Sequence, residues 1–265
     1  MSSPEGRSIL ITGSTDGHGL ALASSLAGDG TAVLVHGRDP EKVERVAGEV
    51  GAAGSYVADL ASLAATRELA GAVSADHERL DVLVNNAGVA TMERRTSEDG
   101  FELDFAVNHL AHFLLTLELL PLLRAAERPR IVNVSSIGQM AIDFDDVMLE
   151  RSWDGARAYC QSKLAQILFT RELADRVGAR PTANALHPAT FMDTNMVHAM
   201  GQTPINTVDE GMQATRRLAV GDDVEGVTGR FFNGTAESGA DPQADDPEAR
   251  RRLWELSARL TGADG

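Results

Sequence analysis

Short apolar segments alternate with helix-length segments along most of this chain. Several short segments, such as Ile9-Leu10-Ile11 and Val82-Leu83-Val84, are apolar throughout rather than at every second residue. Strands of this kind suit a parallel sheet covered on both faces, and the intervening helices supply the right-handed crossovers. We therefore predict one α/β domain with a doubly wound parallel sheet flanked by helices. The predicted strands are 8–12, 31–36, 55–58, 80–85, 130–135 and 182–187, with a weaker one at 229–232, and the predicted helices are 19–27, 40–48, 62–77, 101–124 and 156–177.

Composition argues against several kinds of function. The formal net charge is −15 and no Lys/Arg-rich stripe offsets it, so neither nucleic acid nor an anionic membrane is an expected partner. The single cysteine, Cys160, excludes an internal disulfide and a cysteine-based zinc cluster, and no histidine pair has metal-motif spacing, so we expect no metal site. The most apolar stretch, 113–123, is too short to cross a bilayer. These features favour a cytoplasmic enzyme.

The first predicted strand runs into a glycine-rich loop that precedes a helix. Residues 12–19 read TGSTDGHG, a TGxxxGxG pattern. Glycines let the backbone turn sharply and approach a diphosphate, which the N-terminus of the following helix stabilises. The loop therefore predicts a Rossmann-type dinucleotide-binding domain, although a glycine-rich turn without a ligand also fits this spacing. The candidate binding residues are Gly13, Ser14, Thr15, Asp16, Gly17, His18 and Gly19.

The end of the second predicted strand bears on the choice of dinucleotide. An enzyme for NAD usually has an acidic residue there that binds the adenosine ribose hydroxyls. This chain instead has Gly37, which leaves room, and Arg38, whose planar guanidinium can pair with a 2′-phosphate. The sequence thus favours NADP(H) over NAD(H). The alternative is that Arg38, beside Asp39, is a solvated turn residue.

Tyr159 and Lys163 are four residues apart on a predicted helix, so they share one face. A tyrosine, with an ordinary pKa of about 10, must be acidified to exchange a proton near neutrality, and an ammonium one turn away would stabilise the phenolate. Ser136, just after the fifth strand, could hydrogen-bond the same substrate oxygen. Such a Tyr/Lys pair is usually an ordinary helix surface, but Lys163 is one of only two lysines in the chain.

Together, these motifs resemble the short-chain dehydrogenase/reductase family in their order along nearly the whole chain. The resemblance rests on TGxxxGxG, on NNAG at 85–88, and on Asn108, Ser136 and YxxxK. The segments that resemble the retinol-dehydrogenase-like branch are 38–42, 108–110, 162–165, 226–232 and 253–257.

The resemblance implies a role for each matching residue. Tyr159 would be the general acid/base, and Lys163 would bind the nicotinamide ribose and lower the pKa of Tyr159. Ser136 would orient the substrate carbonyl, with Ser135 as the alternative, and Asn108 would hold a water of the proton relay. The other residues expected to contact the cofactor are Asp59, Leu60, Asn86, Ala87, Gly88, Pro188, Thr190 and Thr194.

Some residues depart from the family's pattern. His18 replaces the usual isoleucine between two loop glycines, and we interpret it as a tolerated substitution. Ala189 stands where glycine is usual. An acidic and apolar insert, 142–148, lengthens the interval between Ser136 and Tyr159, and we expect it to wall the substrate pocket.

The predicted domain covers residues 1–265, with a substrate-binding segment at about 189–207 and a C-terminal extension at about 226–265. The methionines at 192, 196 and 200 suit a bulky apolar ligand, so we expect a lipophilic ketone, aldehyde or alcohol as the substrate. The branch resemblance, with an arginine bias typical of a GC-rich coding sequence, suggests a ketoreductase of secondary metabolism. A reductase of conjugated C=C bonds and a nucleotide-sensing protein without turnover are the alternatives. The family's habit of assembling through the helices that carry Asn108 and Tyr159 leaves a homodimer or homotetramer open.

Overall fold

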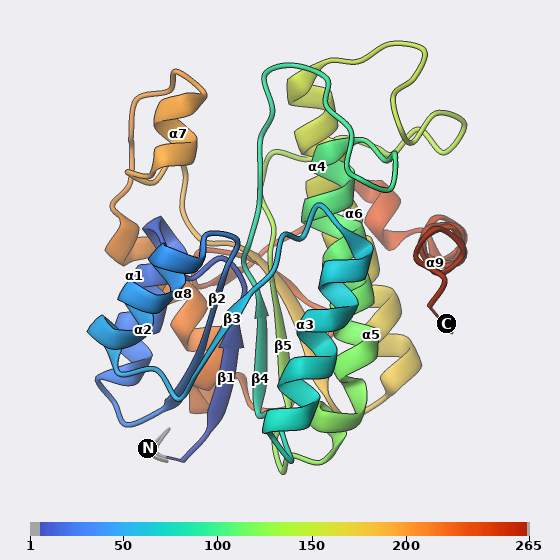
Figure 1. Ribbon diagram of the computed structural model, residues 1–265. Coiled ribbons are helices and arrows are strands. Elements are labelled where there is room, and N and C mark those ends of the chain that lie inside the picture. Colours follow the sequence, from blue (N-terminus) through green and yellow to red (C-terminus); the bar gives the residue numbers. More distant parts are fainter. Residues whose placement is uncertain (1–5, 264–265) are drawn as a thin grey trace.

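The computed structural model describes residues 6–263, which form one eight-stranded sheet between two layers of helices (Figure 1). The strands are β1 (Ser8–Ile11), β2 (Ala32–Gly37), β3 (Gly54–Val57), β4 (Val82–Asn85), β5 (Arg130–Val134), β6 (Thr182–His187), β7 (Phe231–Asn233) and β8 (Ala236–Glu237). Their order in space is β3-β2-β1-β4-β5-β6-β7-β8, and only β7 and β8 pair antiparallel. The chain therefore builds outward from β1 in both directions, and the predicted doubly wound α/β fold is confirmed.

The helices cover the sheet on both faces. They are α1 (Gly17–Ala27), α2 (Pro40–Val50), α3 (Leu63–Asp76), α4 (Leu103–Phe105), α5 (Ala111–Arg124), α6 (Gly155–Val177), α7 (Asn195–Ala199), α8 (Val208–Val220) and α9 (Pro247–Thr261). In Figure 1, α1, α2 and α8 lie on one face, and α3, α5 and α6 lie on the other. Helix α7 stands above the edge of the sheet where the parallel strands end, so it overhangs the region where such sheets bind ligands.

Successive residues of β1 pack into the two cores that these layers form. Ile9 and Ile11 belong to the cluster that contains Leu22 of α1 and Leu218 of α8. Leu10, between them, belongs to the cluster on the α3 and α5 side. A strand with apolar neighbours on both faces needs an uninterrupted apolar run, which is the pattern in the sequence.

Aspartates cap the N-termini of the helices that carry the site. Asp16 accepts a hydrogen bond from Gly17 N at the start of α1, and Asp154 accepts one from Arg157 N at the start of α6. Because Asp16 is the N-cap, α1 begins at Gly17, whereas the sequence pattern placed the start at Gly19.

The helix predicted over 101–124 is present but irregular. A short α4 passes through a π-helical turn, Ala106–Leu110, into α5. The combined helix, Leu103–Arg124, has 22 residues, and its most apolar 18-residue window has a mean hydropathy of 1.4. It is therefore longer than the stretch 113–123 and is long and apolar enough to span a membrane. However, 72% of its most apolar window is buried within the protein, and a core helix passes the same test.

The last third of the chain contains elements that the sequence pattern did not predict. These are α7, α8, α9 and β8. A capping box between Thr207 and Glu210 starts α8, and α9 inserts Trp254 against Phe113, with 5.0 Å between the ring centroids. Both helices are rich in charged residues and bury only one face, so packing rather than overall hydrophobicity defines them.

Candidate active site and dinucleotide loop

Tyr159 and Lys163 lie on α6 and face the end of β5, where Ser136 follows the strand. Ser136 lies close enough to Tyr159 for hydrogen bonding to lower the Tyr159 pKa, and Ser136 Oγ accepts a hydrogen bond from Gly138 N at 2.9 Å. Lys163 Nζ lies 5.7 Å from the centroid of the Tyr159 ring. The fold thus brings these three predicted catalytic side chains together.

Ser135 and Ser136 differ in where their hydroxyl groups point. Ser135 Oγ donates to the backbone oxygen of Lys163 at 2.6 Å, so its hydroxyl is committed to fastening β5 to α6. Ser136 keeps its hydroxyl beside Tyr159. The geometry favours Ser136 as the group that contacts a substrate oxygen.

The pKa of Tyr159 differs from the sequence-based expectation. Lys163 was expected to lower it, but burial raises the Tyr159 pKa to about 12, with only the hydrogen bond to Ser136 opposing the rise. Lys163 does not offset this rise, and its Nζ donates to Val134 O at 2.9 Å and to Gln166 Oε1 at 3.0 Å. Burial also lowers the pKa of Lys163 to about 8, because the protein interior penalises the ammonium.

Asn108 occupies the π-helical turn and is fully buried. Its Oδ1 accepts from Val89 N at 2.8 Å, and its Nδ2 donates to Val89 O and to Ser162 Oγ. Ser162 Oγ in turn donates to the backbone oxygen of Tyr159. Asn108 therefore fastens the loop after β4 to the helix that carries Tyr159, and π-helical turns of this kind are frequent at functional sites.

Asp104 is a neighbour of the reaction centre that the sequence analysis missed. Its carboxylate is completely buried and accepts from Thr91 N at 3.2 Å. Burial, with the nearby Glu102 charge, raises the pKa of Asp104 to about 6, while the charge of Lys163 opposes the rise. No motif marks this residue, because its importance comes from burial that the sequence alone does not reveal.

The glycine-rich loop forms a close contact between β1, α1 and the end of β4. Gly13 has a φ of +62°, and a Cβ at Gly19 would collide with the Gly13 carbonyl oxygen and with Asn86 Nδ2. Asn86 Nδ2 donates to both Thr12 O and Gly13 O. No side chain at Gly13 or Gly19 covers the backbone at the N-terminus of α1, so a diphosphate could approach the backbone N–H groups there.

His36 is a second residue that the sequence analysis missed. Its Nδ1 accepts from Gly13 N at 3.1 Å, and its Nε2 donates to Ala58 O at 3.2 Å. Burial lowers its pKa to about 4, so the ring is neutral and links the ends of β1, β2 and β3. The sequence feature that could have identified His36 is its position as a polar residue at the end of an apolar strand.

The predicted adenosine end is open. Arg38 is exposed, and within residues 6–263 it has no hydrogen bond or ion pair. Asp39 caps α2 by accepting from Glu41 N and Lys42 N, so its carboxylate is occupied there. The space beside Gly37 is not empty as expected, because a Cβ there would lie 2.7 Å from Thr15 Cγ2, so the glycine accommodates Thr15.

The other predicted cofactor residues of β3 and β4 border this loop. Asp59 is exposed and Leu60 is buried, while Ala87 N donates to Thr12 Oγ1 at 2.9 Å. A Cβ at Gly88 would lie 3.3 Å from Asn108 Oδ1 and 3.5 Å from Lys163 Nζ, so this residue connects the loop to the reaction centre.

Segment 189–207 leaves the end of β6 and carries α7. Thr190 N donates to Asn206 Oδ1, which closes the base of the segment, and Thr190 Oγ1 hydrogen-bonds His187 Nε2 at 3.0 Å. Thr194 caps α7 and lies against Gly17, where a Cβ would approach its Cγ2 to 3.2 Å. Pro188 packs near Gly211 of α8. The segment therefore touches the dinucleotide loop directly.

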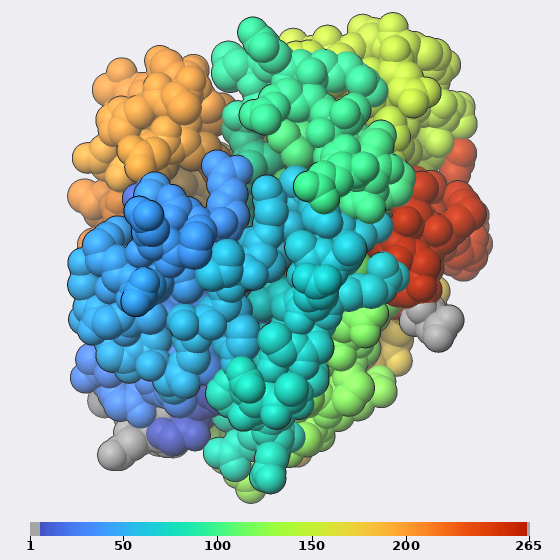
Figure 2. Space-filling model, viewed as in Figure 1, coloured from blue at the N-terminus to red at the C-terminus, as the bar shows by residue number. Residues whose placement is uncertain are grey.

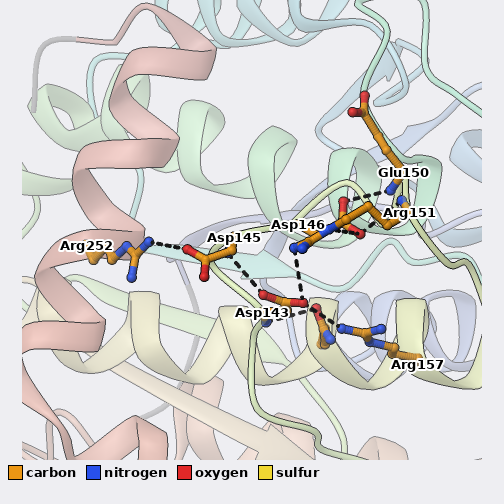
Figure 3. Close-up of polar contacts among 8 residues, drawn as sticks. Asp143, Asp145, Asp146, Glu150, Arg151, Arg157 and Arg252 are labelled. Atoms are coloured by element: carbon orange, nitrogen blue, oxygen red, sulfur yellow. Dashed lines mark hydrogen bonds and ion pairs between the residues drawn. The ribbon is translucent and has the colours of Figure 1, made fainter.

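The insert 142–148 lies on the other side of the site and is fastened by ion pairs (Figure 3). Asp143 pairs with Arg157 of α6 at 3.1 Å, and Asp145 pairs with Arg252 of α9 at 3.2 Å. Figure 2 shows the surface indented between segment 189–207, in orange, and the loop after β4, in green. Within the described residues, no group of His, Cys, Asp and Glu could hold a metal ion.

Comparisons with known proteins identify the family. The family model for short chain dehydrogenase matches residues 7–204, so the chain belongs to the short-chain dehydrogenase family and is an oxidoreductase. Human retinol dehydrogenase 13 is 38% identical over 284 residues, which cover 98% of this chain and 86% of that protein. The predicted likeness to the retinol-dehydrogenase-like branch is thereby confirmed.

Solved structures lead to the same family. A Mycobacterium paratuberculosis protein superposes with a TM-score of 0.81 at 30% identity, covering 99% of this chain and 96% of that one. A short chain dehydrogenase from Shigella flexneri, complexed with NADP, superposes with a TM-score of 0.72 at 27% identity, covering 87% of this chain and 97% of that one.

Proposed function

We propose that this protein is an NADP(H)-dependent oxidoreductase that interconverts a lipophilic ketone or aldehyde with the corresponding alcohol. The observation that carries the proposal is the grouping of Ser136, Tyr159 and Lys163 at the end of β5. The glycine-rich loop and Gly88 border this group, so a dinucleotide bound on the loop would extend toward Tyr159.

Each side chain of the reaction centre has a distinct task. The nicotinamide cofactor supplies or accepts the hydride. Tyr159 is protonated at neutral pH because its pKa is about 12, so it can donate a proton to a carbonyl oxygen, and Ser136 can hydrogen-bond that oxygen. Lys163, held by Val134 O and Gln166, is placed to bind the nicotinamide ribose.

The preference for NADP(H) is supported at the adenosine end. Arg38 is exposed and free to pair with a 2′-phosphate, and Asp39 is engaged in capping α2 rather than in binding ribose. The Shigella flexneri relative, whose structure is a complex with NADP, is consistent with this choice.

A lipophilic substrate is supported by apolar side chains on the loops above the sheet. Met92, Ile137, Met140 and Ile205 are large and exposed, and they belong to the loops that follow β4, β5 and β6. Exposed apolar groups near one edge suit an apolar ligand better than a sugar or a small acid. The retinol named by the relatives is itself a long apolar alcohol.

We further propose that the enzyme acts in the cytoplasm without a nucleic-acid or membrane partner. The net charge of −15 supports this, and the apolar helix Leu103–Arg124 is largely interior. Cell fractionation tests the location, and recovery of the protein in washed membranes would contradict it.

The decisive experiment compares Tyr159→Phe with Tyr56→Phe, which changes the only other tyrosine in the chain. Tyr56 hydrogen-bonds Asp76 and His77 outside the site. Both variants are assayed with NADPH and NADH on retinal, polycyclic ketones and conjugated enones, with separate detection of alcohol and saturated ketone. We expect Tyr159→Phe to lose at least about 100-fold in turnover while still binding NADPH, and Tyr56→Phe to stay active. Unchanged turnover in Tyr159→Phe, or a saturated ketone as the product, would overturn the proposal.

A further inference from the structure

His18, in the first turn of α1, is buried and has a partner on each ring nitrogen. Its Nδ1 lies 2.8 Å from Asn86 Oδ1, and its Nε2 lies 3.0 Å from Thr215 Oγ1 of α8. The side chain is 7% exposed. A ring held at both nitrogens between three elements is more than a tolerated replacement for an apolar residue.

Counting hydrogens fixes the proton on Nδ1. Asn86 Nδ2 donates both of its hydrogens, one to Thr12 O and one to Gly13 O. Its Oδ1 can therefore only accept, so His18 Nδ1 must carry a hydrogen and donate. This holds whether the ring is neutral or charged.

Thr215 can satisfy the other nitrogen in either protonation state. Its Oγ1 has one hydrogen and lies 3.0 Å from both His18 Nε2 and Gly211 O. When the ring is neutral, Thr215 donates to Nε2. When the ring is protonated, Nε2 donates to Thr215 Oγ1, whose hydrogen turns to Gly211 O. The protein thus provides hydrogen bonds for a second proton that comes from solvent.

We propose that His18 is a proton-linked positioning residue of the dinucleotide loop: it is neutral, with hydrogen on Nδ1, in the free protein, and it takes up a proton when a diphosphate binds at the N-terminus of α1. This inference rests on the proposed function, since it needs a dinucleotide on the loop. It predicts that dinucleotide affinity rises as the pH falls, and that it does so through His18.

The surroundings of His18 explain why the free ring is neutral. Burial lowers its pKa below the usual 6.5, and no charged side chain contributes to the shift. The positive end of the α1 dipole also disfavours an imidazolium, and a bound diphosphate would reverse that balance. Most titratable and charged groups on the elements around it are engaged elsewhere: Asp16 with Asn195, His36 with Gly13 and Ala58, Asp193 with His198, Glu210 with Thr207, Arg216 with Asp29, and Arg217 with Asp223. The remaining charged residue of α8, Asp209, is exposed to solvent.

The same contacts connect the loop to the substrate segment. Gly211, the second acceptor of Thr215, packs so closely against Met192 that a Cβ there would collide with its sulfur. Protonation of His18 therefore strengthens a hydrogen bond at the point where α8 meets segment 189–207.

Two measurements test the proposal on the full chain. In ¹⁵N-histidine NMR of the nucleotide-free protein near pH 7.5, we expect His18 to be the neutral Nδ1–H tautomer. In calorimetric titrations with NADP⁺ and NAD⁺, in buffers of different ionisation enthalpy, we expect the wild type to take up a larger fraction of a proton than His18→Gln. NAD⁺ is included because it lacks the 2′-phosphate, which itself titrates near pH 6.

Between pH 8 and pH 6, the wild-type dissociation constant for NAD⁺ should fall about 5-fold more than that of His18→Gln. His77→Gln, in a histidine that contacts Tyr56 outside the loop, should behave as the wild type. Equal proton uptake in the wild type and His18→Gln, or an Nε2–H tautomer, would overturn the inference about His18. If the nucleotides still bound, the proposed function would not be affected by that result. Failure of both nucleotides to bind the wild type would instead overturn the proposed function.

Discussion

The reaction centre and the adenosine end lie along the same edge of the sheet but are built differently. At the reaction centre, Lys163 is 4% exposed and donates to two acceptors, and Asn108 is fully buried with all its amide groups bonded. At the adenosine end, Arg38 is exposed and has no polar partner among residues 6–263. The protein's own contacts fix the geometry of the proposed reaction centre, whereas the proposed adenosine end has few such contacts. Substitutions at the two ends should therefore differ in size and in the kinetic constant that they change.

The largest effect is expected for Lys163→Met, which leaves Val134 O and Gln166 Oε1 without their donor. Turnover should fall by about 10³-fold, since the nicotinamide ribose would lose the ammonium proposed to bind it beside Tyr159. Steady-state kinetics, with circular dichroism for folding, measure this. Lys42→Met, in the exposed second lysine, is the control and should match the wild type. Comparable turnover in both variants would contradict the assignment of Lys163.

Asp104 provides a pH-dependent test of the reaction centre. Its pKa is raised to about 6 in the folded protein, so the folded state binds more protons than the unfolded state between about pH 4 and pH 6. The free energy of unfolding should therefore fall as the pH rises through this window. Asp104→Asn removes the effect, and denaturant melts should show the variant more stable than the wild type by up to about 3 kcal/mol at pH 7.5.

At pH 4 the difference between the wild type and Asp104→Asn should vanish, because both side chains are then neutral. Asp223→Asn, in an exposed aspartate paired with Arg217, serves as the control and should show no such pH-dependent gain. A wild type that is as stable as Asp104→Asn at pH 7.5 would mean that the carboxylate is not strained by burial.

A smaller effect is expected at the adenosine end. Arg38→Ser should lower kcat/KM for NADPH by about 10-fold and leave that for NADH nearly unchanged, because an exposed guanidinium–phosphate pair is weaker than a buried one. The change should appear in KM rather than kcat, which distinguishes this end from the reaction centre. Arg45→Ser, in an arginine of α2 that pairs with Glu49, is the control. An equal loss with both cofactors would exclude a 2′-phosphate contact.

The smallest effect is expected at the insert. Asp145→Asn removes the ion pair with Arg252, in which both side chains are more than half exposed. Solvent screens such pairs, so the free energy of unfolding should change by less than about 0.5 kcal/mol. Thermal melting measures this, and a larger loss would show that the pairs in Figure 3 hold the pocket wall in place.

Strands that are buried on both faces were predicted correctly, because burial on both faces leaves an uninterrupted run of apolar residues in the sequence. All seven predicted strands are present within about two residues of their expected bounds. Helices α8 and α9 were missed because each buries only one face of a charged sequence, and the π-helical turn at Asn108 was missed because no residue type marks it. The grouping of Ser136, Tyr159 and Lys163 could be predicted because these residue types are unusual in combination. Asp104, His36 and Gln166 were not predicted, because their identities are ordinary and only their surroundings are unusual.

The sequence alone determined the alternation of strands and helices along the chain, the position of the glycine-rich loop and the residues that meet at the end of β5. Apolar runs can be covered only by helices on both faces, and only glycine tolerates the close contact at Gly19. The tertiary structure decided the protonation states. It raised the pKa of Tyr159 rather than lowering it, and it gave both nitrogens of His18 a partner. The physical reason is that a pKa depends on burial and on hydrogen-bond partners far apart in the chain, which residue spacing cannot express.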